Sequence, residues 1–152
     1  MRRKDREITD RAEMEAILRE ATVCRVAITD GIEPYVIPLC FGYADGDLYF
    51  HSAREGRKIE VLMANPYCCI EADDCGGPIP SDNPCRWEFR YRSVICMGIA
   101  EFVEDPEEKR KGLDAILQHY HAGNYPFADK DLERVCVVKI VIREMTGKKY
   151  GG

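Results

Sequence analysis

The chain has 152 residues and a mass of 17.4 kDa, which suits a single domain over residues 1–152. Hydrophobic residues make up 45% and charged residues 32% of it, a composition that favours a folded protein with a core and excludes a disordered segment. The net charge of −5 argues against a broad nucleic-acid-binding surface, and the absence of a run of about 18 apolar residues argues against a membrane span.

The first part of the chain predicts one helix and three strands. Asp10 is a suitable N-cap, Glu13 completes a D-x-x-E capping pattern, and apolar residues spaced by three and four continue the helix to Ala21. Turn signals then separate three β-rich segments, at residues 22–29, 34–43 and 48–51. Pro38 cannot donate a ladder hydrogen bond, so its strand should lie at an edge, a bulge or a bend.

The second part predicts two helices and three more strands. A short helix with an apolar face ends at Asn65-Pro66, and a longer helix begins at Pro106 and runs to about Tyr120. The charged run from Glu104 to Lys111 is interpreted as a solvated helix start. The remaining segments are a strand at 67–72, a loop rich in proline and glycine at 73–84, a strand at 87–102 with Gly98 as a bulge or close approach, and a strand at 135–142.

Six strands joined mostly by short turns predict an antiparallel β-barrel with packed helices, a mainly β fold of the α+β class. The βαβα alternation of a doubly wound sheet is missing. A barrel also hides the edges that six apolar strands would otherwise expose.

Eight cysteines stand mostly within apolar segments, where a free cysteine behaves as a small hydrophobe. A metal or iron–sulfur site would have to use Cys68, Cys69, Cys75 and Cys85. No CxxC pair occurs among these four, and adjacent cysteines on a strand point to opposite faces. We therefore predict no metal site. The opening MRRKDRE lacks an apolar h-region, so we expect no secretory signal and a cytoplasmic protein.

The most informative segment is HSAREGRK, residues 51–58, where a strand is expected to end and a helix to begin. Such a junction offers free backbone N–H groups and the positive end of a helix dipole. Gly56 allows close approach of a ligand, Arg57 and Lys58 add positive charge, and Ser52 adds a hydroxyl. These residues fit a phosphate monoester. From local sequence alone, a solvated helix face with a glycine turn remains an equal interpretation.

The wider pattern contains PYVIPLCFGY, YFHSAREGRK, RYRSVI and EFVEDPEEK, in that order. It resembles the pyridoxamine-phosphate-oxidase-like split-barrel flavoproteins, and within them the nitroimidazole-reductase branch, over nearly the whole chain. The resemblance implies a six-stranded antiparallel split β-barrel that binds flavin mononucleotide (FMN) between the two subunits of a homodimer.

The resemblance also implies three groups of FMN-binding residues. The phosphate would contact Ser52, Arg57 and Lys58, with Gly56 where the oxidases carry a serine. The ring edge would follow the backbone of Ile37, Pro38, Leu39, Cys40 and Phe41, and His51 would flank the ribityl chain or the ring. Arg92 and Ser93 would reach the flavin of the second subunit.

The function that the resemblance implies is an FMN-dependent oxidoreductase that reduces a small acceptor, such as a nitro-aromatic or quinone-like compound. No GxGxxG motif is present, so a reduced nicotinamide or other small-molecule electron donor would dock transiently. His51 is the candidate proton donor. The oxidases' C-terminal Arg-x-His pattern is absent, so we do not expect vitamin B6 oxidation. The alternatives are a flavin-binding or redox-sensing module without turnover, and a related cofactor such as F420 or haem.

Overall fold

The computed structural model describes residues 3–151, so Met1, Arg2 and Gly152 of the expected domain lie outside the described residues. One antiparallel sheet contains eight strands in the order β3-β2-β6-β7-β8-β5-β4, with β1 paired to β8. The elements are η1 (Lys4–Arg6), β1 (Glu7–Ile8), α1 (Arg11–Glu20), β2 (Cys24–Thr29), β3 (Pro34–Leu39), β4 (Gly42–Ala44), β5 (Asp47–Ser52), α2 (Arg57–Ala64), β6 (Tyr67–Ile79), η2 (Pro84–Arg86), β7 (Glu88–Val103), α3 (Pro106–His119), α4 (Asp129–Arg134) and β8 (Cys136–Tyr150). The predicted mainly β fold is confirmed, with eight strands in place of six.

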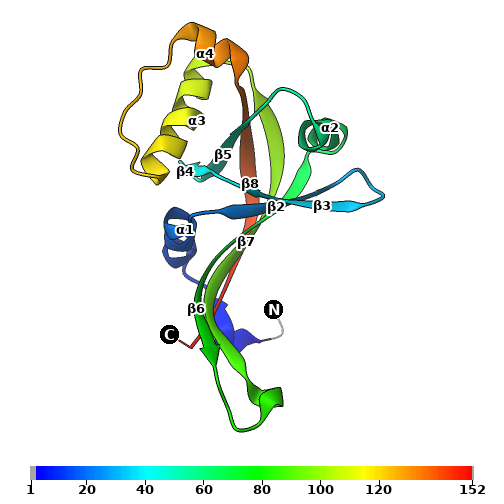
Figure 1. The fold of residues 1–152 in the computed structure, drawn as a ribbon, viewed down its shortest axis with the longest axis vertical. Coiled ribbons are helices and arrows are strands. Elements are labelled where there is room, and N and C mark those ends of the chain that lie inside the picture. The colour runs from blue at the N-terminus through cyan, green and yellow to red at the C-terminus, as the bar shows by residue number, and fades with distance from the viewer. Residues whose placement is uncertain (1–2, 152) are drawn as a thin grey trace.

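The sheet rolls into a split barrel because its two outermost strands, β3 and β4, are consecutive in the chain and joined only by Cys40 and Phe41. Figure 1 shows the strands crossing in the middle of the molecule, with α1, α2 and α3 placed around them. Alternate residues of each strand face inward, as in the buried-exposed pattern of β2. The inward-facing side chains form the main core, which includes Val26, Phe50, Ile70, Val94 and Ile140.

The first helix begins where the sequence predicts. The Asp10 carboxylate accepts a hydrogen bond from the Ala12 amide at 3.0 Å, which confirms the N-cap. The other half of the capping pattern does not form, because the Glu13 carboxylate binds the Lys149 amine at 2.7 Å. Glu13 thus ties α1 to the end of β8.

The predicted loop at 73–84 is wrong in its first half. Strand β6 continues to Ile79 and pairs with β7 as far as Glu88, with a register shift between Cys75 and Gly77. Only β7 flanks this stretch, since β2 pairs with residues 69–71 alone, so Pro78 can lie on a free edge. The resulting β6–β7 hairpin extends away from the barrel as an arm (Figure 1).

Other boundaries also differ from the prediction. The strand expected at 34–43 is split into β3 and β4, and Pro38 lies on the edge strand β3 as predicted. Strand β8 continues to Tyr150 because its second half pairs with the arm part of β7. The predicted irregularity at Gly98 is confirmed by a register shift between Met97 and Gly98. The short elements β1 and α4 were not predicted.

A second, smaller core lies between the sheet and the helix pair α3–α4, and it includes Tyr49, Leu113, Leu132 and Val137. The interpretation of Glu104 to Lys111 as a solvated helix start is wrong at one residue. Lys109 is only 5% exposed, and its amine donates to the Leu132 carbonyl of α4 at 3.1 Å. Its side chain thus packs between α3 and α4 and does not stand in solvent. No helix within residues 3–151 is long and apolar enough to cross a membrane.

Candidate functional site

The start of α2 is an open, positively charged corner. Strand β5 ends at Ser52, and Gly56 is the N-cap of α2, with a φ of 117° and no side-chain cap. No heavy atom lies within 4 Å of the position that a Cβ would occupy at Gly56. The space in front of this helix end is therefore open. The Ile59 and Glu60 amides donate to the Gly56 carbonyl, at 2.9 and 3.1 Å, so the Arg57 and Lys58 amides are the first-turn N–H groups without an intrahelical acceptor in the described part of the chain. A glycine suits this position because its φ is in the left-handed region.

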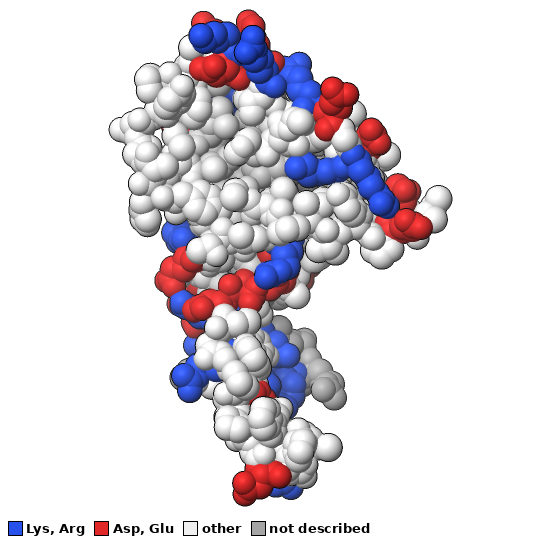
Figure 2. All heavy atoms as spheres, viewed as in Figure 1, with Lys and Arg blue, Asp and Glu red and all other residues white. Residues whose placement is uncertain are grey.

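Arg57 and Lys58 stand on this helix end in different environments. The Arg57 guanidinium lies 4.7 Å from the centre of the Tyr35 ring and 3.2 Å from a Glu33 oxygen, on the side of β3. The Lys58 amine lies 5.5 Å from the centre of the Phe50 ring, over the inner face of β5. Figure 2 shows basic atoms gathered between α2 and the β2–β3 hairpin, with acidic atoms toward the hairpin tip.

Lys58 is a half-buried cation without a counter-ion. Burial lowers the pKa of its amine, and the nearby Cys136 thiol opposes this effect. Within residues 3–151, no carboxylate lies within 4.0 Å of the Lys58 amine. A desolvated ammonium beside an uncapped helix N-terminus favours an anion, so the residues present fit a phosphate group.

Ser52 and His51 lie on opposite faces of β5. Ser52 pairs with Cys136 on β8 and lies on the same face as Leu48 and Phe50, toward the barrel interior. His51 pairs with Val137 and is exposed on the other face. Ser52 and Lys58 thus both lie near Cys136 of β8, whereas the His51 imidazole lies on the outer face.

The segment from Ile37 to Phe41 runs along the edge of the sheet. Ile37 and Leu39 pack partly against the core, while Pro38 and Cys40 are exposed, so Cys40 is not the buried hydrophobe expected of it. Phe41 is fully buried, with its ring 4.4 Å from that of His119 and its amide donating to the Tyr120 hydroxyl at 3.2 Å. The edge of β3 leaves backbone groups available to a ligand, whereas the Phe41 ring and amide are engaged within the fold.

Arg92 and Ser93 do not join the corner within one chain. Both lie on the part of β7 that forms the arm, and the Arg92 guanidinium binds Asp74 at 3.0 Å and Glu20 of α1 at 2.5 Å. The arm and α2 lie at opposite ends of the molecule (Figure 1). Any contact between Arg92 or Ser93 and a ligand at the corner has to come from a second subunit.

An apolar outer sheet face was missed by the sequence analysis. Strand register aligns Val36, Ala27, Cys69 and Met97 side by side across β3, β2, β6 and β7. Val36 is 56% exposed and Met97 47% exposed, and Ile95 and Tyr67 extend the apolar surface on the same face. The signal in the sequence was partial, because the outward positions of these strands mix apolar residues, such as Val36, Cys69 and Met97, with polar ones, such as Arg25 and Glu71.

The cysteines are separated by the fold. Burial raises the pKa of the Cys24, Cys68 and Cys96 thiols to about 12 each, which keeps these groups protonated at neutral pH. Cys68 faces the core, Cys69 the outer sheet face, and Cys75 and Cys85 are exposed on the arm. Within residues 3–151, no group of three or more His, Cys, Asp or Glu side chains is arranged to hold a metal ion.

The sequence model of the family described as pyridoxamine 5'-phosphate oxidase matches residues 10–149. A Bacteroides thetaiotaomicron protein, solved as a candidate 5-nitroimidazole antibiotic resistance protein, is 40% identical, with a TM-score of 0.82 over 93% of this chain and 85% of its own. An FAD and heme binding protein from Mycobacterium smegmatis shares the fold at 20% identity and a TM-score of 0.87, over 97% of this chain and 74% of its own. A flavocytochrome from Azotobacter vinelandii shares the fold at 22% identity and a TM-score of 0.87, over 100% of this chain and 72% of its own. No curated protein matches the chain.

We expect Lys58→Met to stabilise the ligand-free protein at neutral pH. Because burial lowers the pKa of Lys58 on folding, the charged amine is less favourable in the folded than in the unfolded state. This penalty applies below the unfolded pKa of about 10.4 and disappears as the pH rises past it. Urea unfolding midpoints of wild type and variant should therefore differ at neutral pH and converge near about pH 10.5.

The matched control is Lys149→Met, which removes an amine that is paired with Glu13 at 2.7 Å and should bring no gain in stability. A Lys58→Met variant that is less stable than wild type, by an amount that does not change with pH, would contradict the uncompensated charge.

Proposed function

Because the chain belongs to the pyridoxamine 5'-phosphate oxidase family, whose members bind flavins, we propose that it is a homodimeric FMN-dependent reductase of small acceptors. One observation carries the cofactor assignment: the uncompensated Lys58 amine beside Arg57 at the open start of α2. The 40% identity to the candidate nitroimidazole resistance protein supports a nitro-aromatic acceptor.

In this proposal the phosphate of FMN docks at the corner. The Ser52 hydroxyl and the backbone amides of Arg57 and Lys58 donate hydrogen bonds to it, and the Arg57 and Lys58 side chains neutralise its charge. Gly56 admits the anion because no side chain fills the space before it. Lys58 then gains the counter-ion that the described part of the chain does not give it.

The remaining protein groups orient the ring and the acceptor. The backbone of Ile37 to Cys40 offers hydrogen-bonding groups along the free edge of β3, and the Phe41 carbonyl continues this line. When bound, the flavin supplies the electron and hydride transfer. His51, exposed at the end of β5, is proposed to hold a proton on an imidazole nitrogen and to donate it to the reduced acceptor.

A second copy of the chain is the proposed partner of the apolar outer sheet face. Exposed apolar patches of this kind mark interaction surfaces, and the row from Val36 to Met97 spans four strands without an ion pair. A dimer would also let the arm of one subunit bring Arg92 and Ser93 to the other subunit's corner.

The phosphate assignment predicts a difference between two flavins. Lys58→Gln should weaken FMN binding by about tenfold or more, since it removes a charge-assisted contact. It should leave riboflavin, which has no phosphate, bound as in wild type. Flavin fluorescence titration measures both affinities, with Lys149→Gln as the control for loss of a surface amine. Equal losses for FMN and riboflavin would exclude a specific phosphate contact.

The dimer assignment predicts that Met97→Glu converts the protein to monomers and releases flavin. Burial of an unpaired carboxylate in an apolar interface costs roughly several kcal/mol. Light scattering after size-exclusion chromatography gives the mass. Ile32→Glu is the control, because Ile32 is 88% exposed at the β2–β3 turn, outside the aligned row. A monomeric wild type, or a Met97→Glu variant that remains dimeric, would refute this interface.

The proton-donor assignment predicts that His51→Ala lowers kcat by about 100-fold or more while the flavin content stays unchanged. Steady-state assays with NADH or NADPH and a 5-nitroimidazole or a quinone measure turnover. His121→Ala is the control, since His121 is an exposed imidazole beyond α3. Unchanged turnover in His51→Ala would remove this role. A wild type without turnover with any pair would favour a flavin-binding module instead.

A further inference from the structure

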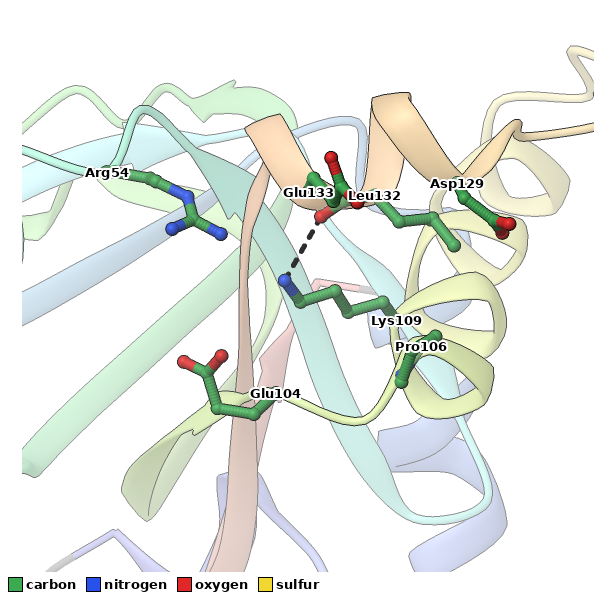
Figure 3. Close-up of a pocket in the computed structure, with 7 residues that line it drawn as sticks. All are labelled: Arg54, Glu104, Pro106, Lys109, Asp129, Leu132 and Glu133. Atoms are coloured by element: carbon green, nitrogen blue, oxygen red, sulfur yellow. Dashed lines mark hydrogen bonds between the residues drawn. The ribbon is translucent and has the colours of Figure 1, made fainter.

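A hollow of about 520 Å³ lies between the β5–α2 loop, the start of α3 and α4. Figure 3 shows its lining residues, with the Arg54 guanidinium and the Lys109 amine directed toward a common space and the Glu104 carboxylate below it. These three side chains come from three separate parts of the chain. The hollow is separate from the side of α2 on which Arg57 contacts Tyr35.

Lys109 places a buried positive charge on this wall. The residue is 5% exposed, and its amine donates to the Leu132 carbonyl at 3.1 Å and the Val135 carbonyl at 3.5 Å, both at the C-terminal end of α4. An ammonium has three N–H donors, so one remains for another acceptor. Two neutral carbonyls do not cancel the charge, and lysine is rarely buried without an ionic partner.

Three more charged residues that line the hollow, Arg54, Glu104 and Glu133, also have no ionic partner among the described residues. Within residues 3–151, no ion pair within 4.0 Å includes Arg54, Lys109, Glu104 or Glu133. Asp129, by contrast, binds Arg110 at 2.6 Å and is already neutralised. Two cations and at least one carboxylate thus face the same space without touching one another.

The signs of these charges select the ligand. A simple anion between Arg54 and Lys109 would lie near the Glu104 carboxylate and be repelled by it. A simple amine near Glu104 would meet the two cations. We propose that the hollow binds a small zwitterion of the amino-acid class, with its carboxylate between Arg54 and Lys109 and its ammonium toward Glu104. The volume is in the range of small-molecule pockets.

Calorimetric titration of the purified protein with L-alanine, propionate and isopropylamine tests this assignment. Propionate carries only the carboxylate of L-alanine, and isopropylamine carries only its ammonium. L-Alanine should bind at least about tenfold more tightly than either, a factor that corresponds to about 1.4 kcal/mol. No binding of L-alanine, or equal affinity for L-alanine and propionate, would overturn the proposal.

Two variants separate the charges. Glu104→Gln should weaken L-alanine by about tenfold while propionate binds at least as tightly as before, since only the ammonium contact is lost. Arg54→Gln should weaken L-alanine and propionate together. Lys111→Gln is the control, because Lys111 lies on α3 but pairs with Asp45 outside the hollow. A Glu104→Gln variant that leaves the ratio of the two affinities unchanged would also overturn the proposal.

Discussion

A positive charge held against the barrel without a counter-ion is the feature on which the functional account depends. The contrast with Lys139 shows what compensation does in this fold. The Lys139 amine binds Glu108 at 3.0 Å and lies 3.4 Å from Asp47, and the hydrogen bond to Glu108 is the main cause of its raised pKa. In the described part of the chain Lys58 has no such carboxylate, and burial lowers its pKa. In the proposed function, an anion at the start of α2 would recover the free energy that the uncompensated Lys58 charge costs in folding.

The sheet supports this corner through its two unlike faces. Inward-facing residues close the barrel and fix the end of β5, so that Ser52 stands beside the start of α2. The outward face of β3, β2, β6 and β7 carries the apolar row from Val36 to Met97 beside the Arg25–Glu71 ion pair, and a monomer leaves this row in water. The β6–β7 hairpin forms the arm, which carries Arg92 and Ser93 away from the corner of their own chain.

Much of the fold could be predicted from local signals. Asp10, Asn65-Pro66 and Pro106 mark helix ends by side-chain or ring chemistry that acts within a few residues, and all three are confirmed. The edge position of Pro38 follows in the same way from its missing N–H group.

The misses depend on contacts between distant segments. The glycines and proline of residues 73–79 predicted a loop, but these residues pair with β7 and form a strand. Lys109 was predicted to be solvated, since its local sequence gives no sign that α4 packs over α3 and buries it. Of the candidate site, Ser52, Gly56, Arg57 and Lys58 form one corner because they are close in sequence. That His51 lies on the outer face, and that Arg92 lies away from this corner, could be seen only from the strand register.

The most direct test of the account is a crystal structure of the protein grown with FMN. The account predicts a phosphate group within hydrogen-bond distance of the Ser52 hydroxyl, the Arg57 guanidinium and the Lys58 amine, in front of Gly56. A flavin whose phosphate lies elsewhere, with Lys58 still lacking an anionic neighbour, would contradict it.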